Sequence, residues 1–250
     1  MSAPSPDFGT DQEWEEWGRR DPYFAVQTDP RFRLTSITQE AKRYFFETGQ
    51  WEVGQLMRII RQHIDPDFSP RTVLDFGCGV GRSLIPFSDL AREVVGLDVS
   101  PSMLREARRN CDERKASNVK LLLCDDALSS LTGTFDLIHS YITFQHIPPD
   151  RGRAIFCHLL DYLAPGSVAA LHVTYAKMHF AASHGVAPPS PPPTQPALAR
   201  PSSSDPEMQM NSYMLNELFF LMQSRGVKRF HTEFTDHSGE LGVFLLFQAT

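Results

Sequence analysis

Short apolar runs alternate with amphipathic stretches through the middle of the chain. Apolar and β-branched residues predict strands over 71–76, 94–97, 119–124, 135–140 and 167–175. Between these runs, apolar residues recur at helical spacing and predict helices that start near Gly81, at Pro101 and at Arg151, the last two ending at about Lys115 and at Leu163. Ser100 and Asp150 are the expected N-caps of those two helices. Strands that alternate with helices form a mostly parallel sheet with helices on both faces.

The two ends of the chain carry other patterns. Residues 10–20 predict a short helix with Trp14 and Trp17, and 38–64 predict a long helical region interrupted around Gly49. Near the other end, 211–223 predict an apolar helix, and 227–234 and 241–249 predict two strands joined by 235–240. We therefore expect a late β-hairpin to complete the sheet.

Proline marks the main interruption of this pattern. Eight prolines occur between Pro188 and Pro206, and such a run predicts an exposed, polyproline-like loop. The chain then divides into an N-terminal helical and aromatic cap (1–70), a core (71–175), a proline-rich insertion (176–210), and a C-terminal helix with a hairpin (211–250). The first nine residues are expected to be disordered. The aromatic cap is either an extension packed on the core or a lid over the mouth of a site, and these two interpretations are compatible.

Composition narrows the classes of function. Lys and Arg number 24 against 30 Asp and Glu, so the net charge of -6 provides no general attraction for nucleic acid. The four cysteines lack C-x-x-C spacing, and no Cys/His cluster indicates a metal, so buried free thiols in a reducing compartment are expected. No apolar run approaches the roughly 18 residues of a membrane span, and no signal peptide is evident. We expect a soluble, cytoplasmic protein, and the sequence does not indicate its oligomeric state.

A glycine-rich turn follows the first strand of the core. Its pattern is Asp75-x-Gly77-x-Gly79-x-Gly81, and the next strand ends at Asp98. Glycine permits positive φ and close approach of a ligand, and a carboxylate at that strand end suits the two hydroxyls of a ribose. The dinucleotide fingerprint G-x-G-x-x-G would place its third glycine where Arg82 stands. A tight strand-to-helix turn with an unrelated acid downstream is the purely structural alternative.

At these residues the chain resembles the class I S-adenosylmethionine (SAM)-dependent methyltransferases, whose first motif is an acid followed by G-x-G-x-G and whose second strand ends in an acid. The sequence Ser100-Pro101-x-Met103-Leu104 matches the helix start that follows that acid in the family, and Asp126-Ala127 matches the family's acid-Ala pair. The resemblance implies a Rossmann-like doubly wound sheet of seven strands, mostly parallel with a reversed last strand and helices on both faces.

The resemblance also implies which residues contact the cofactor. Asp126 and Ala127 would meet the adenine, Ser140 and Tyr141 would lie near the transferable methyl group, and the segment ahead of the first strand would reach the SAM carboxylate. Core packing is the alternative role of Met103, and a solvated loop that of Asp126. The expected cofactor contacts are Phe46, Gly49, Asp75, Gly77, Cys78, Gly79, Gly81, Arg82, Asp98, Val99, Met103, Asp126, Ala127, Ser140 and Tyr141.

The expected reaction is in-line transfer of the methyl group of SAM to a hydroxyl or amine of a small molecule, such as a carbohydrate or natural product. A hydroxyl acceptor needs a base, for which His146 is the first candidate, followed by Tyr23 and His172, with His237 behind them. His146 has a structural alternative, which is to hold the loop to the next helix. Two other functions stay open: a catalytically silent SAM-binding partner subunit and an NAD-dependent oxidoreductase.

Overall fold

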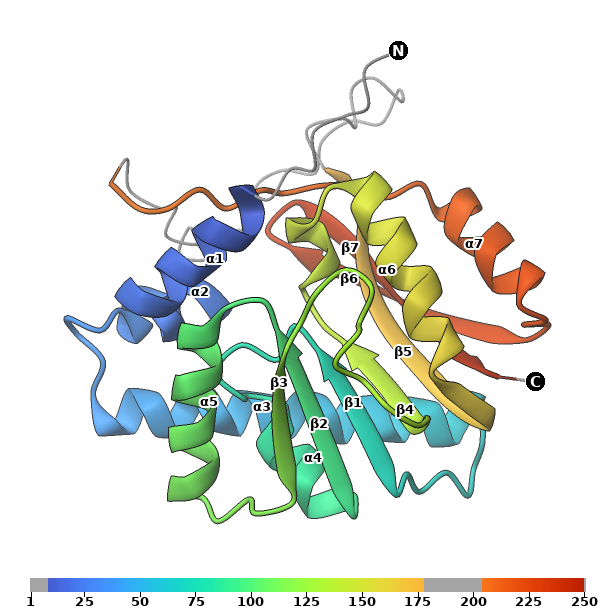
Figure 1. Ribbon diagram of the computed structural model, residues 1–250, viewed down its shortest axis with the longest axis horizontal. Helices are drawn as coiled ribbons and strands as arrows, with labels where there is room; N and C mark the ends of the chain where they lie inside the picture. The colour runs from blue at the N-terminus through green and yellow to red at the C-terminus, as the bar shows by residue number, and fades with distance from the viewer. Residues whose placement is uncertain (1–8, 178–203, 250) are drawn as a thin grey trace.

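The computed structural model describes residues 9–177 and 204–249. Residues 1–8 of the predicted disordered start and most of the predicted proline-rich insertion lie outside these described residues, whereas Gly9, also predicted to be disordered, is the first residue of a helix. In Figure 1 the chain forms one central sheet with helices packed on both of its faces. None of the helices in the described ranges is long and apolar enough to cross a membrane.

Seven strands form a single sheet in the order β3-β2-β1-β4-β5-β7-β6. They are β1 (Thr72–Phe76), β2 (Glu93–Asp98), β3 (Val119–Leu123), β4 (Phe135–Ser140), β5 (Leu163–Lys177), β6 (Phe230–His237) and β7 (Glu240–Gln248). The first five strands pair in parallel, whereas β7 is antiparallel to both of its neighbours, β5 and β6. The predicted doubly wound sheet with a reversed last strand is therefore confirmed.

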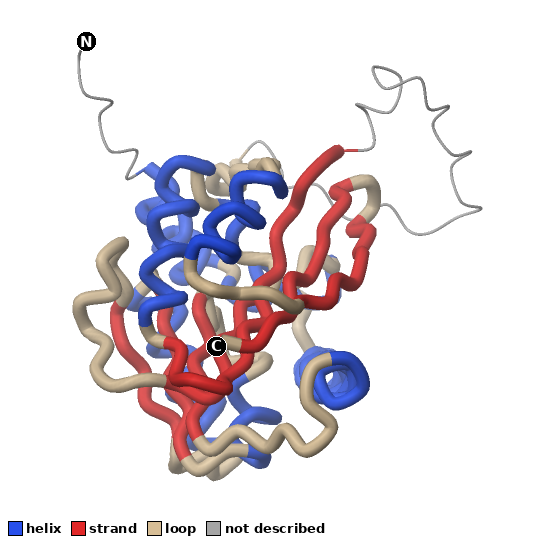
Figure 2. Tube along the Cα trace, turned by 90° about the vertical axis from the view of Figure 1, so that its right-hand side faces the viewer, coloured by secondary structure: helices blue, strands red, loops and turns tan. Residues whose placement is uncertain are grey.

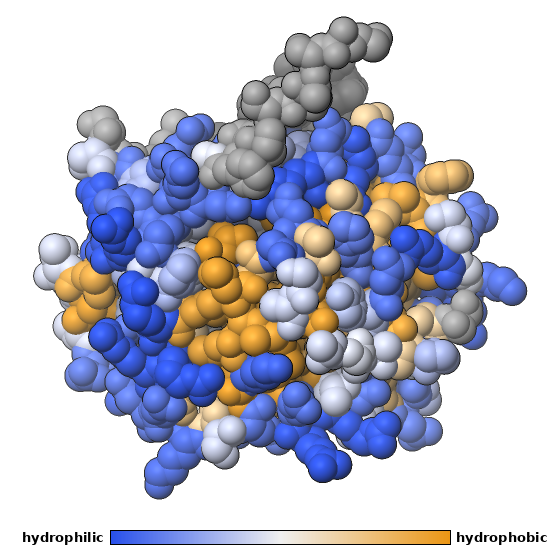
Figure 3. Space-filling view, viewed as in Figure 1, coloured by the Kyte–Doolittle hydropathy of each residue, from blue (hydrophilic) through white to orange (hydrophobic). Residues whose placement is uncertain are grey.

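The helices divide between the two faces of the sheet. Helices α3 (Gln39–His63), α4 (Leu84–Leu90) and α5 (Pro101–Glu113) pack on one face, and α6 (Pro149–Asp161) and α7 (Leu215–Ser224) pack on the other. A smaller cap of α1 (Gly9–Arg20), α2 (Pro22–Val26) and the 3-10 turn η1 (Pro30–Phe32) has its own apolar cluster, centred on Trp17, Phe24, Phe32 and Phe45. Apolar side chains also gather at the centre of one face of the molecule (Figure 3), and Leu123 on the edge strand β3 is 53% exposed.

Tertiary packing changed several predicted element boundaries. Helix α3 runs through Gly49 without the predicted interruption. A Cβ at this position would collide with the carbonyl oxygen of Arg82, so the glycine allows close packing of the helix against Arg82. Helix α4 begins at Leu84, later than expected, because the chain makes turns after Gly79 first. Helix α6 begins at Pro149 instead of after an Asp150 cap, and ends at Asp161, two residues before the predicted end at Leu163.

The carboxyl edge is extended by β5 and the hairpin. Strand β5 starts at Leu163 rather than at the predicted Ser167, because Leu163 already pairs with Phe135 of β4. A register shift follows, and the next pair along β4 is Leu137 with Val168. The β6–β7 connection is a two-residue turn, Ser238-Gly239, with φ of 58° and 96°, where a longer loop was predicted. The segment before α7 is extended, since the backbone N–H of Tyr213 donates to the carbonyl of Thr174. Figure 2 shows β5 and the hairpin rising past the rest of the sheet.

Candidate functional site

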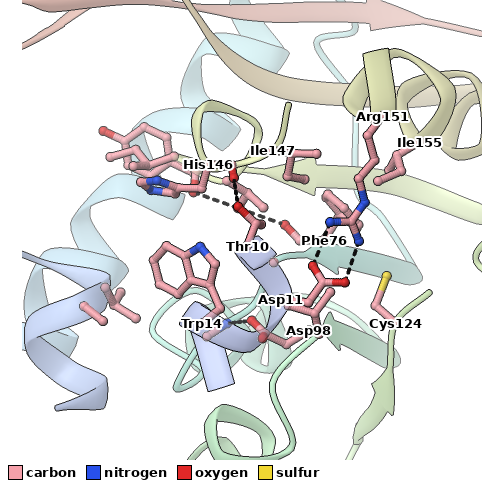
Figure 4. A pocket seen from close by; sticks show the side chains of 18 of the residues that line it. Thr10, Asp11, Trp14, Phe76, Asp98, Cys124, His146, Ile147, Arg151 and Ile155 are labelled. Atoms are coloured by element: carbon pink, nitrogen blue, oxygen red, sulfur yellow. Dashed lines mark hydrogen bonds and ion pairs between the residues drawn. The ribbon is translucent and has the colours of Figure 1, made fainter. Parts of the chain in front are cut away.

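The principal cavity lies where β1, β2 and β4 end and where α1 and α2 cross above them (Figure 4). Carboxyl ends of parallel strands are the usual place for a ligand in such a sheet. Eight of the predicted site residues line the cavity: Gly77, Gly79, Arg82, Asp98, Val99, Asp126, Tyr141 and His146. Its volume is about 100 Å³. The cavity is this small because side chains of the cap project into it.

The glycine-rich turn uses the conformations that the sequence predicted. Gly77, Gly79 and Gly81 have φ of 74°, 52° and 88°, which side-chain-bearing residues rarely adopt. A Cβ on Gly77 would collide with the side chain of Thr143, and one on Gly79 would lie 2.8 Å from Val26 Cγ2. The turn is therefore shaped for close approach, and at present Val26 of the cap lies against it.

Asp98 is held by this turn. Its Oδ2 accepts the backbone N–H of Gly79 at 2.8 Å, and its Oδ1 accepts that of Ser100 at 2.9 Å. Burial raises the pKa of Asp98 to about 6, although the two backbone hydrogen bonds oppose the shift. Each carboxylate oxygen has a further lone pair for a ligand hydroxyl, which would compensate the charge that burial destabilises.

Arg82 supplies a buried cation beside the turn. Its Nη1 pairs with Glu52 Oε2 at 2.6 Å, and its Nε has no hydrogen-bond partner among the described residues. Burial raises the pKa of Glu52, which the neighbouring guanidinium opposes. Because an unpaired buried N–H is costly, the Nε of Arg82 is a donor available to an anionic group in the cavity.

The far end of the cavity contains a network of three charged residues. The guanidinium of Arg151, on α6, donates to both carboxylate oxygens of Asp126, with its Nε 2.8 Å from each. The same side chain donates from Nη1 and Nη2 to the two oxygens of Asp11, on α1, at 2.8 and 2.7 Å. Figure 4 shows Arg151 extending toward Asp11 of the cap. The backbone carbonyl of Asp126 is also used, since it accepts from Nδ1 of His158 at 2.8 Å.

His146 is fully engaged by its neighbours. Its Nδ1 lies 2.8 Å from the carbonyl oxygen of Gln209, which only accepts, so this nitrogen carries the proton. Nε2 then accepts from the side-chain amide of Gln145 at 3.3 Å, whose oxygen in turn accepts from Thr174 at 2.8 Å. Burial lowers the pKa of His146 to about 4. Neither ring nitrogen has a free lone pair, so this geometry favours the structural alternative.

Two other histidines have unused nitrogens. His172 Nε2 lies 2.8 Å from Thr235 Oγ1, while its Nδ1 and the Nε2 of His237 are buried without a hydrogen-bond partner among the described residues. The centroids of the two imidazole rings lie 5.1 and 5.8 Å from that of Tyr141, which itself lines the cavity. Burial lowers the pKa of His172 to about 3 and also lowers that of His237. Both imidazoles are therefore neutral near pH 7 and lie behind the cavity wall.

The remaining predicted residues do not line the cavity. The hydroxyl of Tyr23 lies on the α5 side, 2.6 Å from Glu106 Oε1 and 2.8 Å from Asn110 Oδ1, and burial raises its pKa. Asp75 is in the core, 2.7 Å from His139 Nδ1. Met103 and Phe46 belong to the apolar cluster of the cap. The others that do not line it are Gly49, Cys78, Gly81, Ala127, Ser140 and His172.

The sequence did not reveal several residues that line the cavity. Thr10, Asp11 and Trp14 come from α1, and Arg151 and Ile155 come from α6. The aromatic character of the cap, already considered as a lid, was the only sequence signal for α1. Nothing in the sequence links Arg151 with a carboxylate 140 positions away.

One group in the described ranges has the composition of a metal site. His63, His231 and Glu233 offer ligand atoms within 4.8 Å of one another, and they lie outside the principal cavity. The two imidazole rings stack at 3.8 Å between centroids with an interplanar angle of 2°. Nitrogen lone pairs lie in the ring plane, so stacked rings direct them side by side rather than to one ion. We assign no metal to this group.

Comparison with known proteins shows similarity to methyltransferases. Residues 73–166 match the family model described as a methyltransferase domain. Among curated proteins, the chain is 32% identical over 95 residues to aklanonic acid methyltransferase DauC of Streptomyces sp. (strain C5), which covers 36% of this chain and 43% of that protein. It is 34% identical over 107 residues to trans-aconitate 2-methyltransferase of Methylobacterium radiotolerans, covering 42% of this chain and 38% of that protein. The chain therefore spans less than half the length of these two relatives.

Solved structures extend the similarity to the whole fold. Magnesium protoporphyrin IX methyltransferase (ChlM) from Synechocystis PCC 6803 with bound SAM matches with a TM-score of 0.65 and 18% identity, over 100% of both chains. N-methyltransferase NodS from Bradyrhizobium japonicum WM9 with bound S-adenosylhomocysteine matches with a TM-score of 0.59 and 13% identity, over 96% of this chain and 98% of that chain. At these identities the structures show the fold, and the matched domain covers residues 73–166, which include the glycine-rich turn and Asp98. Residues 73–166 therefore form a methyltransferase domain, and the chain has the fold of the class I S-adenosylmethionine-dependent methyltransferases.

Proposed function

We propose that this protein transfers the methyl group of SAM to a hydroxyl or amine of a small molecule. The observation that carries the proposal is the pairing of the positive-φ glycine turn with Asp98, at the edge of the sheet where β1 and β2 end. When bound there, SAM supplies an electrophilic methyl group. The chain's own contribution is to orient the two reactants and to exclude water between them.

The residues present fit the cofactor. The free lone pairs of Asp98 suit ribose hydroxyls, and the unpartnered Nε of Arg82 beside the glycine turn suits the carboxylate of the methionine part. Val99 and Asp126 line the end of the cavity that the adenine would occupy. The polar partners are therefore present in the chain, and the volume of the cavity depends on the position of the cap.

The acceptor side is proposed at Tyr141, which lines the cavity. The imidazoles of His172 and His237, each with one nitrogen that has no hydrogen-bond partner among the described residues, lie beside it. A hydroxyl or amine loses a proton when it is methylated, and His146 has no free lone pair to take it. We therefore transfer the proposed role of base from His146 to His172 or His237, whose free nitrogens are behind Tyr141. Tyr23 is not proposed again, because its hydroxyl is hydrogen-bonded to residues of α5 and burial raises its pKa, so it stays protonated and cannot take up another proton.

A small-molecule acceptor is favoured over a nucleic acid by the net charge of -6. Two of the relatives are named for small acids, aklanonic acid and trans-aconitate, and a Bos taurus relative is named for guanine N7 of 18S rRNA. These names define the classes that an acceptor screen has to separate.

Calorimetry with SAM and with S-adenosylhomocysteine tests the cofactor assignment first, with Asp98→Asn as the site variant. Formation of S-adenosylhomocysteine is then followed over separate panels of phenols and alcohols, amines, carboxylic acids and 18S rRNA. We expect both cofactor forms to bind and turnover to appear in the hydroxyl or amine panel. No binding at millimolar cofactor would refute the proposal as a whole, and turnover only with acids or RNA would refute its acceptor class.

A further inference from the structure

The cap closes the cofactor cavity. Sites for small molecules and cofactors usually measure about 300–1,000 Å³, whereas this cavity measures about 100 Å³. Val26 lies against Gly79, and Thr10, Asp11 and Trp14 of α1 form part of the lining. Because the strand ends are fixed in the sheet and the glycine turn is hydrogen-bonded to β2, α1 and α2 are the lining elements whose displacement would enlarge the space.

The two halves of α1 have different attachments. Toward its C-terminal half, Glu15 accepts from Ser100 Oγ, Ser102 Oγ and the backbone N–H of Ser102, at 2.6–2.9 Å. Gly18 packs so closely that a Cβ would lie 2.5 Å from Ser100 Oγ. These contacts fasten α1 to the start of α5. The first turns of α1 extend from this anchor over the cavity.

The first turns of α1 are attached through Arg151, and Glu13 adds a carboxylate oxygen that accepts the backbone N–H of Glu207 at 2.7 Å. The guanidinium of Arg151 bridges Asp11 on α1 and Asp126 on the cavity wall, with both of its edges in bidentate contact. The arginine side chain is 13% exposed and that of Asp11 is 28% exposed, so water screens this pair less than a surface pair. Thr10 adds a hydrogen bond from its hydroxyl to the carbonyl of His146 at 3.2 Å, and the Trp14 ring lies 4.8 Å from that imidazole.

We propose that Asp11 and Arg151 form a latch that holds α1 closed over the adenosyl pocket, and that the latch opens to admit and release the cofactor. The inference rests on the proposed function, because it concerns the same site. Arg151 is a positioning residue here: its contact with Asp126 fixes the wall at the adenine end, and its contact with Asp11 fixes the cover. Breaking only the second contact frees the cover and leaves the wall intact.

Asp11→Asn is the variant that separates these two roles, and Asp150→Asn is its matched control. Asp150 also pairs with an arginine of α6, Arg153, but its side chain is 92% exposed and is not part of the cavity. Binding and release of S-adenosylhomocysteine are followed by stopped-flow tryptophan fluorescence. We expect Asp11→Asn to raise both the association and the dissociation rate constants about fivefold, the factor that loss of an ion pair of about 1 kcal/mol gives, with Asp150→Asn unchanged.

Two kinetic results would overturn the latch. Wild-type rates in Asp11→Asn mean that the ion pair does not control access. A faster dissociation with an unchanged association rate means that α1 is a fixed wall of the site rather than a cover. Arg151→Met and the double variant complete a cycle, in which we expect the double variant to match Arg151→Met in both rates.

Hydrogen exchange of the ligand-free protein tests the latch without the cofactor. Amides of the first turns of α1 should exchange faster in Asp11→Asn than in wild type, while amides of α5 keep their wild-type rates. In the Asp150→Asn control, the amides of α1 should exchange as in wild type. Unchanged exchange in α1 refutes the latch even if the wild-type protein binds no cofactor. Faster exchange together with an absence of cofactor binding refutes the proposed function and retains the mobile cover.

Discussion

The backbone N–H of Gly79 donates to Oδ2 of Asp98 at 2.8 Å, which joins the middle glycine of the turn after β1 to the acid that ends β2. The two residues are 19 positions apart, and the register that pairs Phe76 with Leu97 brings them together. The turn thus positions the carboxylate, while burial makes its charge costly. This relationship makes the site sensitive to substitution at either residue.

Replacement of Asp98 by Asn should weaken binding of S-adenosylhomocysteine by about 1–3 kcal/mol, roughly 5- to 150-fold, because a neutral amide accepts hydrogen bonds less strongly than a carboxylate. Titration calorimetry measures the change directly, and circular dichroism verifies that the variant is folded. Unchanged affinity in a folded variant would remove Asp98 from the cofactor site.

The affinity of the wild-type protein for S-adenosylhomocysteine should depend on pH through the same group. The pKa of Asp98 is raised to about 6, so the charged acceptor is present above that pH and is lost as the pH falls through it. We expect the dissociation constant to rise between pH 7 and 5 in wild type and to stay nearly constant in Asp98→Asn. Parallel profiles for the two proteins would assign the dependence to another group.

Gly79→Val should abolish cofactor binding, because φ of 52° strains any side chain and the added Cβ points toward Val26 and the cavity. Gly133→Val is the matched control, since Gly133 has φ of 78° but no atom within 4 Å of its Cβ position. Both variants should lose stability of about 1–2 kcal/mol in urea unfolding. Only the first should lose binding, and equal affinities in calorimetry would contradict the role of the turn.

His146→Asn should change the acid stability of the fold. Burial lowers the pKa of His146 to about 4, below the unfolded value of about 6.5, so the unfolded chain binds more protons between these values. The free energy of unfolding therefore falls as the pH falls from about 6.5 to 4, by up to about 3 kcal/mol from this group.

Urea unfolding from pH 7 to 4.5 measures this contribution. The variant should be less stable than wild type at pH 7, because Gln145 and Gln209 lose their partner, but its stability should decrease less on acidification. Equal slopes in the two proteins would show that His146 does not titrate as its burial implies. His172, with a pKa lowered to about 3, accounts for part of the remaining slope.

His237→Asn should lower the turnover number for the best acceptor found in the screen, because its free Nε2 beside Tyr141 is a proposed base. The affinity for S-adenosylhomocysteine should change little, because His237 does not line the cavity. His146→Asn serves as the comparison, and its turnover should fall less once stability is accounted for. The opposite order would return the role of base to His146.

The sequence by itself predicted the succession of strands and helices along the chain and the position of the glycine-rich turn. Apolar runs and glycine spacing are local signals, because the period of side-chain burial and the need for positive φ depend on a few consecutive residues. For this reason β4 was predicted with its observed bounds. Four of the residues predicted to contact the cofactor, Gly77, Gly79, Asp98 and Tyr141, line the cavity.

Only the tertiary structure decided the uses of side chains that find their partners far along the chain. The sequence made His146 the first candidate base, but in the fold both of its ring nitrogens are hydrogen-bonded, to Gln145 and Gln209. Tyr23 was a further candidate, but its hydroxyl is hydrogen-bonded to Glu106 and Asn110. Arg151 carried no signal until folding set it between two acids. The physical reason is that hydrogen bonding and desolvation depend on distances in space, which residue order does not encode locally.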